Sequence, residues 1–126
     1  MTTLQSYIAG RWIGREAAQS LRSAVNGQAI ASTHAEAIDF AEALAHARRV
    51  GIPALMALDF QQRAERLKAL AKYIAANKET LYAVSAHTGA TRADGWVDIE
   101  GGAGTLAAYA GIGSNELPSG NLVHEG

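Results

Sequence analysis

The sequence predicts a mainly α-helical chain of about four helices, preceded by short amino-terminal β-hairpins. Two observations support this fold class: β-branched and aromatic residues gather around glycines near the amino terminus, and apolar residues recur at helical spacing from residue 38 onward. Capping residues precede three of the helical runs. We divide the chain into a hairpin region over residues 1–32, a helical region over 33–113 and an irregular tail over 114–126, within one domain.

Composition excludes several classes of function. Eleven basic and 12 acidic residues give a net charge of −1, which provides no field to attract nucleic acid or anionic lipid. The absence of cysteine excludes disulfides, thiolate catalysis and cysteine-bound zinc within this chain. No segment approaches the roughly 20 apolar residues of a membrane span. We therefore expect a soluble, cytoplasmic protein with no nucleic-acid or membrane partner.

Two hairpins are expected near the amino terminus. Residues 6–13 place aromatic and β-branched side chains around Gly10, and residues 25–31 contain Asn26-Gly27, a pair that favours a two-residue turn. The polar, small residues 14–23 between them fit a surface connection.

The first two helices are predicted from their caps. Thr33 and Glu36 form a capping-box pattern, and the helix that follows is expected to end at Gly51 and Pro53. Its apolar positions are Ile38, Ala41, Leu44, Ala45 and Ala47. Asp59 and Gln62 form the same pattern before the second helix. The apolar face of that helix comprises Phe60, Ala64, Leu67, Leu70, Ala71 and Ile74, and we expect Arg63, Arg66, Lys68 and Lys72 to be solvated.

Two further helices follow. One is expected over residues 78–88, with Leu81 and Val84 facing inward and Gly89 closing it in a left-handed conformation. Thr91 and Asp94 can cap the next helix. Its expected inward face comprises Val97, Ile99, Ala103, Leu106, Ala107 and Ala110.

One glycine pattern invites a different interpretation. Gly102-x-Gly104-x-x-Ala107 satisfies the spacing of a dinucleotide-binding loop. Asp98 and Glu100 lie just before it, however, and would repel a diphosphate. We favour glycines within a helix, each costing about 1 kcal/mol relative to alanine and offset by close approach of a neighbouring backbone.

Other reactive groups lack the arrangements that catalysis or metal binding needs. The four histidines, His34, His46, His87 and His124, show no metal-ligand spacing, and Ser85 and Ser114 lack the setting of a hydrolase nucleophile. Asp98 and Glu100 are two residues apart and would point to different helix faces, although either could hold a monovalent cation or cap an amide. We therefore predict no catalytic, cofactor-binding or metal-binding residue in this chain.

Several segments in order resemble a known family. They read "YIAGRWI", "VNGQAIAST", "AEAIDFAEALAHARR", "RAERLKALAKYIAANKETLYAVSAHTGAT" and "LAAYAG". The chain is thereby similar to the amino-terminal part of the aldehyde dehydrogenase superfamily, whose fold is α/β. The segment "TGATRADGWVDIEGG" resembles the aldehyde dehydrogenase half of bifunctional phenylacetate-degradation proteins and their relatives that act on coenzyme A-linked semialdehydes. Most superfamily members carry Lys where this chain has Ala90.

The resemblance implies oxidation of an aldehyde to an acid, with NAD or NADP as the hydride acceptor. It also implies that the cysteine nucleophile, the activating carboxylate and the nucleotide-binding segments lie beyond Gly126. The chain would then be an incomplete domain that is inactive alone, with no cofactor of its own. Its partner would be the remainder of the polypeptide, or other copies of itself. The alternative is a stand-alone helical interaction module.

Overall fold

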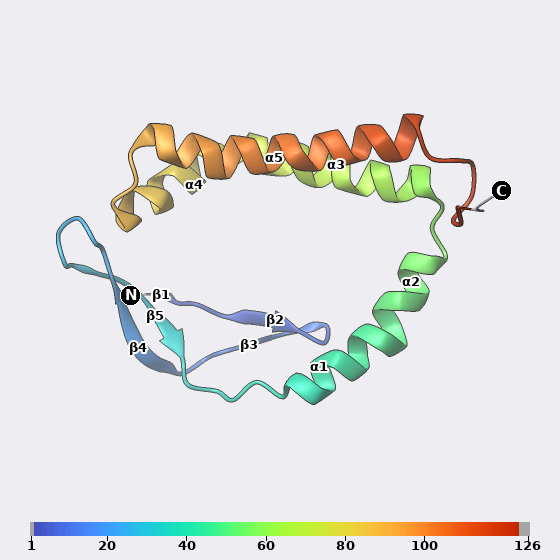
Figure 1. Ribbon diagram of the computed structural model, residues 1–126. Coiled ribbons are helices and arrows are strands. Elements are labelled where there is room, and N and C mark those ends of the chain that lie inside the picture. The colour runs from blue at the N-terminus through green and yellow to red at the C-terminus, as the bar shows by residue number, and fades with distance from the viewer. Residues whose placement is uncertain (1, 124–126) are drawn as a thin grey trace. The chain divides into compact units, whose positions relative to one another are not determined.

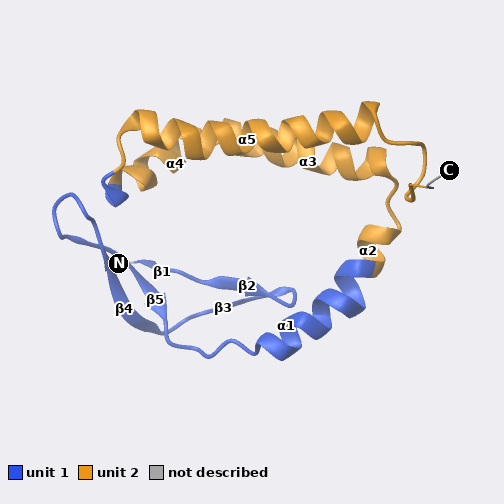
Figure 2. Ribbon diagram, viewed as in Figure 1, with its two compact units in different colours: residues 1–52, 87–89 blue, residues 53–86, 90–126 orange. Residues whose placement is uncertain are grey.

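The computed structural model describes residues 2–123 and divides the chain into two compact units. Unit 1 comprises residues 1–52 and 87–89, and unit 2 comprises residues 53–86 and 90–126 (Figure 2). Unit 1 contains the five strands found in residues 2–123, and unit 2 contains the long helices α3 and α5 (Figure 1). The predicted class, mainly helical with short amino-terminal strands, is confirmed.

The first predicted hairpin is present in unit 1. Strand β2 (Ser6–Ile8) pairs antiparallel with β3 (Arg11–Ile13), and the two-residue loop between them is Ala9-Gly10. Both loop residues have positive φ, 50° at Ala9 and 81° at Gly10. This is the conformation that matches the twist of a hairpin, and glycine adopts it without strain.

The second hairpin exists, but its strands differ from those predicted. Strand β4 (Ala17–Arg22) pairs antiparallel with β5 (Ala29–His34), so most of the expected surface connection over residues 14–23 is a strand. Arg22 pairs with Ala29, so the loop is longer than the predicted two-residue turn. Within that loop Gly27 adopts a φ of 72°. Strand β1 (Thr2–Thr3) adds to β5 in parallel, giving the order β1-β5-β4.

The predicted start of the first helix at Thr33 is wrong. Thr33 lies in β5, and the carboxylate of Glu36 accepts hydrogen bonds from the amides of Gly14 (2.9 Å) and Arg15 (3.1 Å). These two bonds, led by that from Arg15, hold the pKa of Glu36 below its ordinary value of 4.5. The carboxylate therefore caps a loop distant in sequence. Helix α1 (Phe40–His46) begins instead after Asp39, whose side chain accepts from the amide of Glu42.

The first helix also continues beyond its predicted end. Gly51 is the last residue of a π-helical turn, η1 (Ala47–Gly51), and α2 (Ile52–Met56) follows directly. The amide of Ile52 bonds to the carbonyl of Ala47, five residues earlier. Pro53 has no amide hydrogen and cannot donate a helical hydrogen bond. The helix is nevertheless not ended there, because the turn before Pro53 is the wider π-helical turn and α2 continues from it.

Unit 2 contains the helices whose boundaries were predicted best. Helix α3 (Phe60–Ala76) begins with the capping box of Asp59 and Gln62. Helix α4 (Lys78–Ser85) continues into a short 3₁₀ turn, η2 (Ala86–Thr88), and Gly89 follows with a φ of 86°, as predicted. The predicted inward face of α4 is wrong, because Leu81 and Val84 are exposed and Tyr82 is buried.

Helix α5 (Arg92–Asn115) starts with the predicted capping box of Thr91 and Asp94 and ends two residues beyond the predicted helical region. It lies beside α3 along most of its length (Figure 1). Of its predicted inward face, Ala103 and Ala110 are buried and Ile99 and Leu106 half-buried, whereas Val97 and Ala107 are exposed.

Close approach occurs at two other glycines of α5. A Cβ atom at Gly113 would lie 3.0 Å from the Cβ of Ala64, and one at Gly95 would lie 3.2 Å from the ring of Tyr82. Gly102 and Gly104, where we expected close contact, have no such neighbour within 4 Å. The helices therefore meet through the predicted Ala64, Ala103 and Ala110 together with Gly113, which the sequence pattern did not single out.

Candidate functional site

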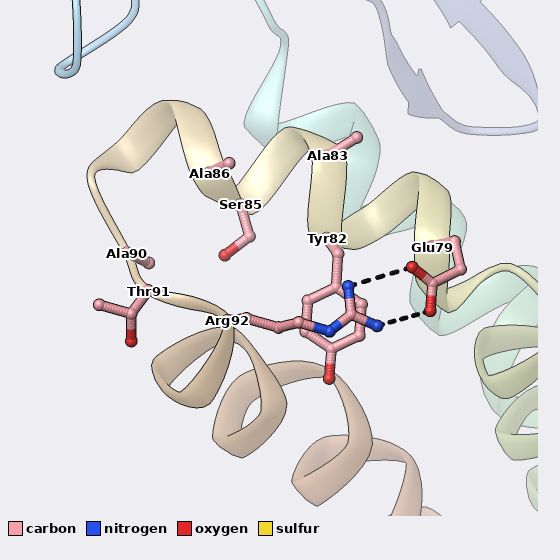
Figure 3. Close-up of a pocket in the computed structure, with 8 residues that line it drawn as sticks. All are labelled: Glu79, Tyr82, Ala83, Ser85, Ala86, Ala90, Thr91 and Arg92. Atoms are coloured by element: carbon pink, nitrogen blue, oxygen red, sulfur yellow. Dashed lines mark hydrogen bonds and ion pairs between the residues drawn. The ribbon is translucent and has the colours of Figure 1, made fainter.

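The most polar cluster of unit 2 joins α4 to the first turns of α5. It consists of Lys78, Glu79, Tyr82, Arg92 and Glu100. Three of these residues border a partly open hollow of about 310 Å³, which Figure 3 shows with Ser85 and the linking residues 90 and 91.

Tyr82 and Lys78 converge on one carboxylate. The Tyr82 hydroxyl donates to Oε2 of Glu100 at 2.6 Å, and the Lys78 ammonium donates to Oε1 at 2.7 Å. Lys78 and Tyr82 are four residues apart on α4, so both side chains lie on the face toward α5. Glu100 is placed to receive them because it lies two turns into α5, on a half-buried side of that helix.

Arg92 forms the second connection. Its guanidinium donates two hydrogen bonds to the carboxylate of Glu79, at 2.7 and 3.1 Å. The same guanidinium lies over the Tyr82 ring, 4.2 Å from its centre, as Figure 3 shows. The guanidinium thus covers one face of the ring, and Gly95 leaves room for the ring because a Cβ there would lie 3.2 Å from two ring carbons.

The positive charges of Lys78 and Arg92 balance the negative charges of Glu79 and Glu100, and the hydrogen bonds shift the pKa values of both carboxylates and of Tyr82. Hydrogen bonds from Lys78 and Tyr82 lower the pKa of Glu100 below 4.5, and that from Arg92 lowers the pKa of Glu79. The bond to Glu100 raises the pKa of Tyr82 above 10. None of these shifts moves a group toward neutral pH, where a general acid or base works best. The arrangement is suited to fixing α4 against α5.

The sequence singled out only part of this cluster. Asp98 and Glu100 do not act together: Glu100 binds Lys78 and Tyr82, so it neither caps an amide nor stands free for a cation, and Asp98 is exposed. Tyr82 and Arg92 were missed. The signal for Tyr82 was its i, i+4 spacing from Lys78, which marks the buried face of α4 better than Leu81 and Val84 do.

The remaining candidate residues are dispersed. His34 lies 3.1 Å from the Ser6 hydroxyl through Nε2, and His87 lies 3.2 Å from the Ser23 hydroxyl through Nδ1, both in unit 1. His46 lies in the last turn of α1, and His124 lies outside the described residues. Ser114 is exposed near the end of α5. Within residues 2–123, no three His, Asp or Glu side chains cluster in a way that could hold a metal ion.

The sequence pattern of the aldehyde dehydrogenase family matches residues 12–122. The chain belongs to this family. It is also 34% identical over 125 residues to the 3,4-dehydroadipyl-CoA semialdehyde dehydrogenase of Aromatoleum evansii. That alignment covers 98% of this chain and 24% of the relative, so the chain spans about a quarter of the relative's length.

Membership agrees with the fold, because short strands followed by four main helices match the amino-terminal region of the aldehyde dehydrogenase fold. Full-length members of the family use NAD or NADP. The glycine pattern does not form a dinucleotide-binding loop: Gly102, Gly104 and Ala107 lie in the interior of α5, where the backbone amides bond within the helix. Within residues 2–123, no helix has the length and apolar character needed to cross a bilayer.

Proposed function

We propose that this chain supplies the amino-terminal framework of an NAD(P)-dependent aldehyde dehydrogenase that oxidises a coenzyme A-linked semialdehyde in aromatic, phenylacetate-type catabolism. The supporting observation is the 34% identity over 98% of the chain to a CoA-semialdehyde dehydrogenase, of which it spans 24%. On this proposal the protein is cytoplasmic, and its partner is the remainder of an aldehyde dehydrogenase polypeptide.

By itself the chain is proposed to be inactive. It has no cysteine to act as the thiolate nucleophile, and its most polar cluster holds its side chains in ion pairs and hydrogen bonds. The glycine pattern in α5 offers no free amides to a dinucleotide. The cluster of Lys78, Tyr82 and Glu100 serves to hold the framework together.

A chimera tests the framework role. The matching segment of the Aromatoleum evansii enzyme is replaced by residues 1–126, and oxidation of a CoA-linked semialdehyde is followed by absorbance of the reduced cofactor. Retained turnover supports the proposal. A chimera that folds but shows no turnover contradicts it.

The isolated chain provides the second test. Mixed with NAD or NADP and aliphatic or CoA-linked aldehydes, it should give no rise in absorbance; steady turnover would show that reactive groups are present after all. Sedimentation of the same sample addresses the alternative, an interaction module. The many exposed large apolar side chains favour irregular association of a framework piece, whereas a module should form one defined complex.

A further inference from the structure

Helix α5 has no polar face over most of its length. From Gly101 to Asn115, "GGAGTLAAYAGIGSN", it contains no charged residue. A helix that is apolar on all sides is normally covered on all sides, because water solvates its backbone and side chains poorly. Within unit 2, however, its main contacts are with α3 and α4, and its buried residues lie on one side.

The side away from α3 carries a continuous set of small and apolar residues, which we name the outer face of α5. These residues recur at helical spacing: Val97, Gly101, Ala108 and Ile112. Val97 is 62% exposed and Ile112 40% exposed, and Ala108 between them is also exposed. The opposite side, with Ala103, Ala110 and Gly113, is the buried one.

We propose that the outer face of α5 is the surface on which the remainder of the aldehyde dehydrogenase polypeptide packs. The inference rests on the proposed framework function and assigns it a contact surface. Glycine and alanine at the centre allow a partner backbone to approach closely, while Val97 and Ile112 border them with larger apolar side chains. Because the outer face carries no charge, the element that packs on it should also be apolar. The relative, about four times longer than the chain, contains the additional polypeptide needed to supply one.

Charge argues against a second copy as the occupant. Two outer faces packed antiparallel would bring Asp94 and Asp98 of each copy to the carboxyl end of the other helix, near Glu116. The negative end of the helix dipole and the acidic side chain both repel carboxylates. Parallel packing would instead place Asp94 beside Asp94.

Matched substitutions test the proposal in the full-length chimera. Ala108→Glu introduces a charge at an exposed alanine of the outer face, and Ala69→Glu introduces the same charge at an exposed alanine of α3, beside Gln62, Glu65 and Arg66. If the outer face is covered, Ala108→Glu places an unpaired charge in an apolar contact. We expect it to lower the midpoint of thermal unfolding of the chimera by on the order of 5 °C or more, with Ala69→Glu within about 1 °C of the parent.

The same pair in the isolated 126-residue chain identifies the occupant. Both variants should unfold close to the parent there, because the outer face is then open. An equal loss for Ala108→Glu in the isolated chain would show that unit 1 covers the face. A defined dimer that Ala108→Glu dissociates, detected by sedimentation, would show that a second copy does. Either outcome overturns the proposal, as does equal stability of the two variants in the chimera.

Failure of this proposal is distinguishable from failure of the proposed function. Thermal unfolding requires a folded chimera and not an active one. A chimera that folds without turnover removes the proposed function and leaves the stability comparison valid. A chimera that does not fold shows that the framework cannot pack on the relative's remaining chain. That result directly contradicts the proposed contact surface on α5.

Discussion

Gly113 determines how closely α5 can approach α3. A Cβ at this position would meet the Cβ of Ala64 at 3.0 Å and the carbonyl oxygen of Phe60 at 3.5 Å. Ala64 is itself only 2% exposed, so neither partner has space into which to move. The contact between the two long helices therefore depends on the absence of a side chain at Gly113.

A larger residue at this position should separate the helices. We expect Gly113→Leu to lower the free energy of unfolding by about 1–3 kcal/mol, because the added side chain overpacks a closed contact. Gly102→Ala, in open space on the same helix, should instead raise it by up to about 1 kcal/mol through helix propensity. Chemical denaturation followed by circular dichroism measures both, and a stabilising Gly113→Leu would contradict the observed approach.

Ala9 is the one described non-glycine residue with positive φ. An L-residue with a Cβ pays about 1–2 kcal/mol for the left-handed region, whereas asparagine enters it more readily. Ala9→Asn would create the Asn-Gly pair that two-residue hairpin loops prefer. We expect the variant to stabilise the β2–β3 hairpin by about 1 kcal/mol, seen as slower amide hydrogen exchange at Ile8 and Arg11, the pair that flanks the loop. Unchanged exchange would show that the loop does not limit the hairpin's stability.

At the scale of elements, the predictions succeeded where the signal was local. The capping boxes at Asp59 and Thr91 involve residues three apart, and both are formed as the sequence indicated. Gly89 likewise occupies the left-handed conformation expected of it. Caps and tight turns are predictable because their hydrogen bonds close within a few residues.

The predictions were wrong where a residue's conformation or burial depends on a contact with a residue distant in sequence. Thr33 and Glu36 have the same local pattern as Asp59 and Gln62, but β5 pairing holds Thr33 extended and the Gly14 and Arg15 amides bind Glu36. In the α4–α5 cluster, a tyrosine is buried in preference to Leu81 and Val84 because Glu100 satisfies its hydroxyl and Gly95 leaves space for its ring. Neither partner is adjacent in sequence, so periodicity alone could not reveal them.

The connection between α4 and α5 should weaken in acid. Because folding lowers the pKa of Glu100, its contribution to stability is complete above the ordinary value of 4.5 and is lost as pH falls below it. We expect the difference in unfolding free energy between the parent and Glu100→Gln to be largest near neutral pH and to shrink below pH 4.5. Asp98→Asn controls for loss of one charge from the same helix. A difference that stays constant from neutral to acidic pH would count against the Lys78 and Tyr82 bonds.

At the scale of the whole molecule, little apolar surface is buried. The buried apolar residues of the described chain are four alanines and Tyr82, while large side chains such as Trp12, Phe40, Tyr73 and Trp96 are exposed. A chain of 126 residues is long enough for a larger core. Much of the apolar composition therefore lies on the surface of the described chain, which agrees with the proposed framework role.

This thin core has a consequence for the cooperativity of unfolding. The slope of stability against urea concentration scales with the surface newly exposed on unfolding, and small proteins usually give about 1–3 kcal/mol per molar. Since so many large side chains already contact water in the folded chain, we expect a slope at or below about 1 kcal/mol per molar and a correspondingly broad transition. A steep, narrow urea transition would mean that solvent is excluded from these side chains in solution.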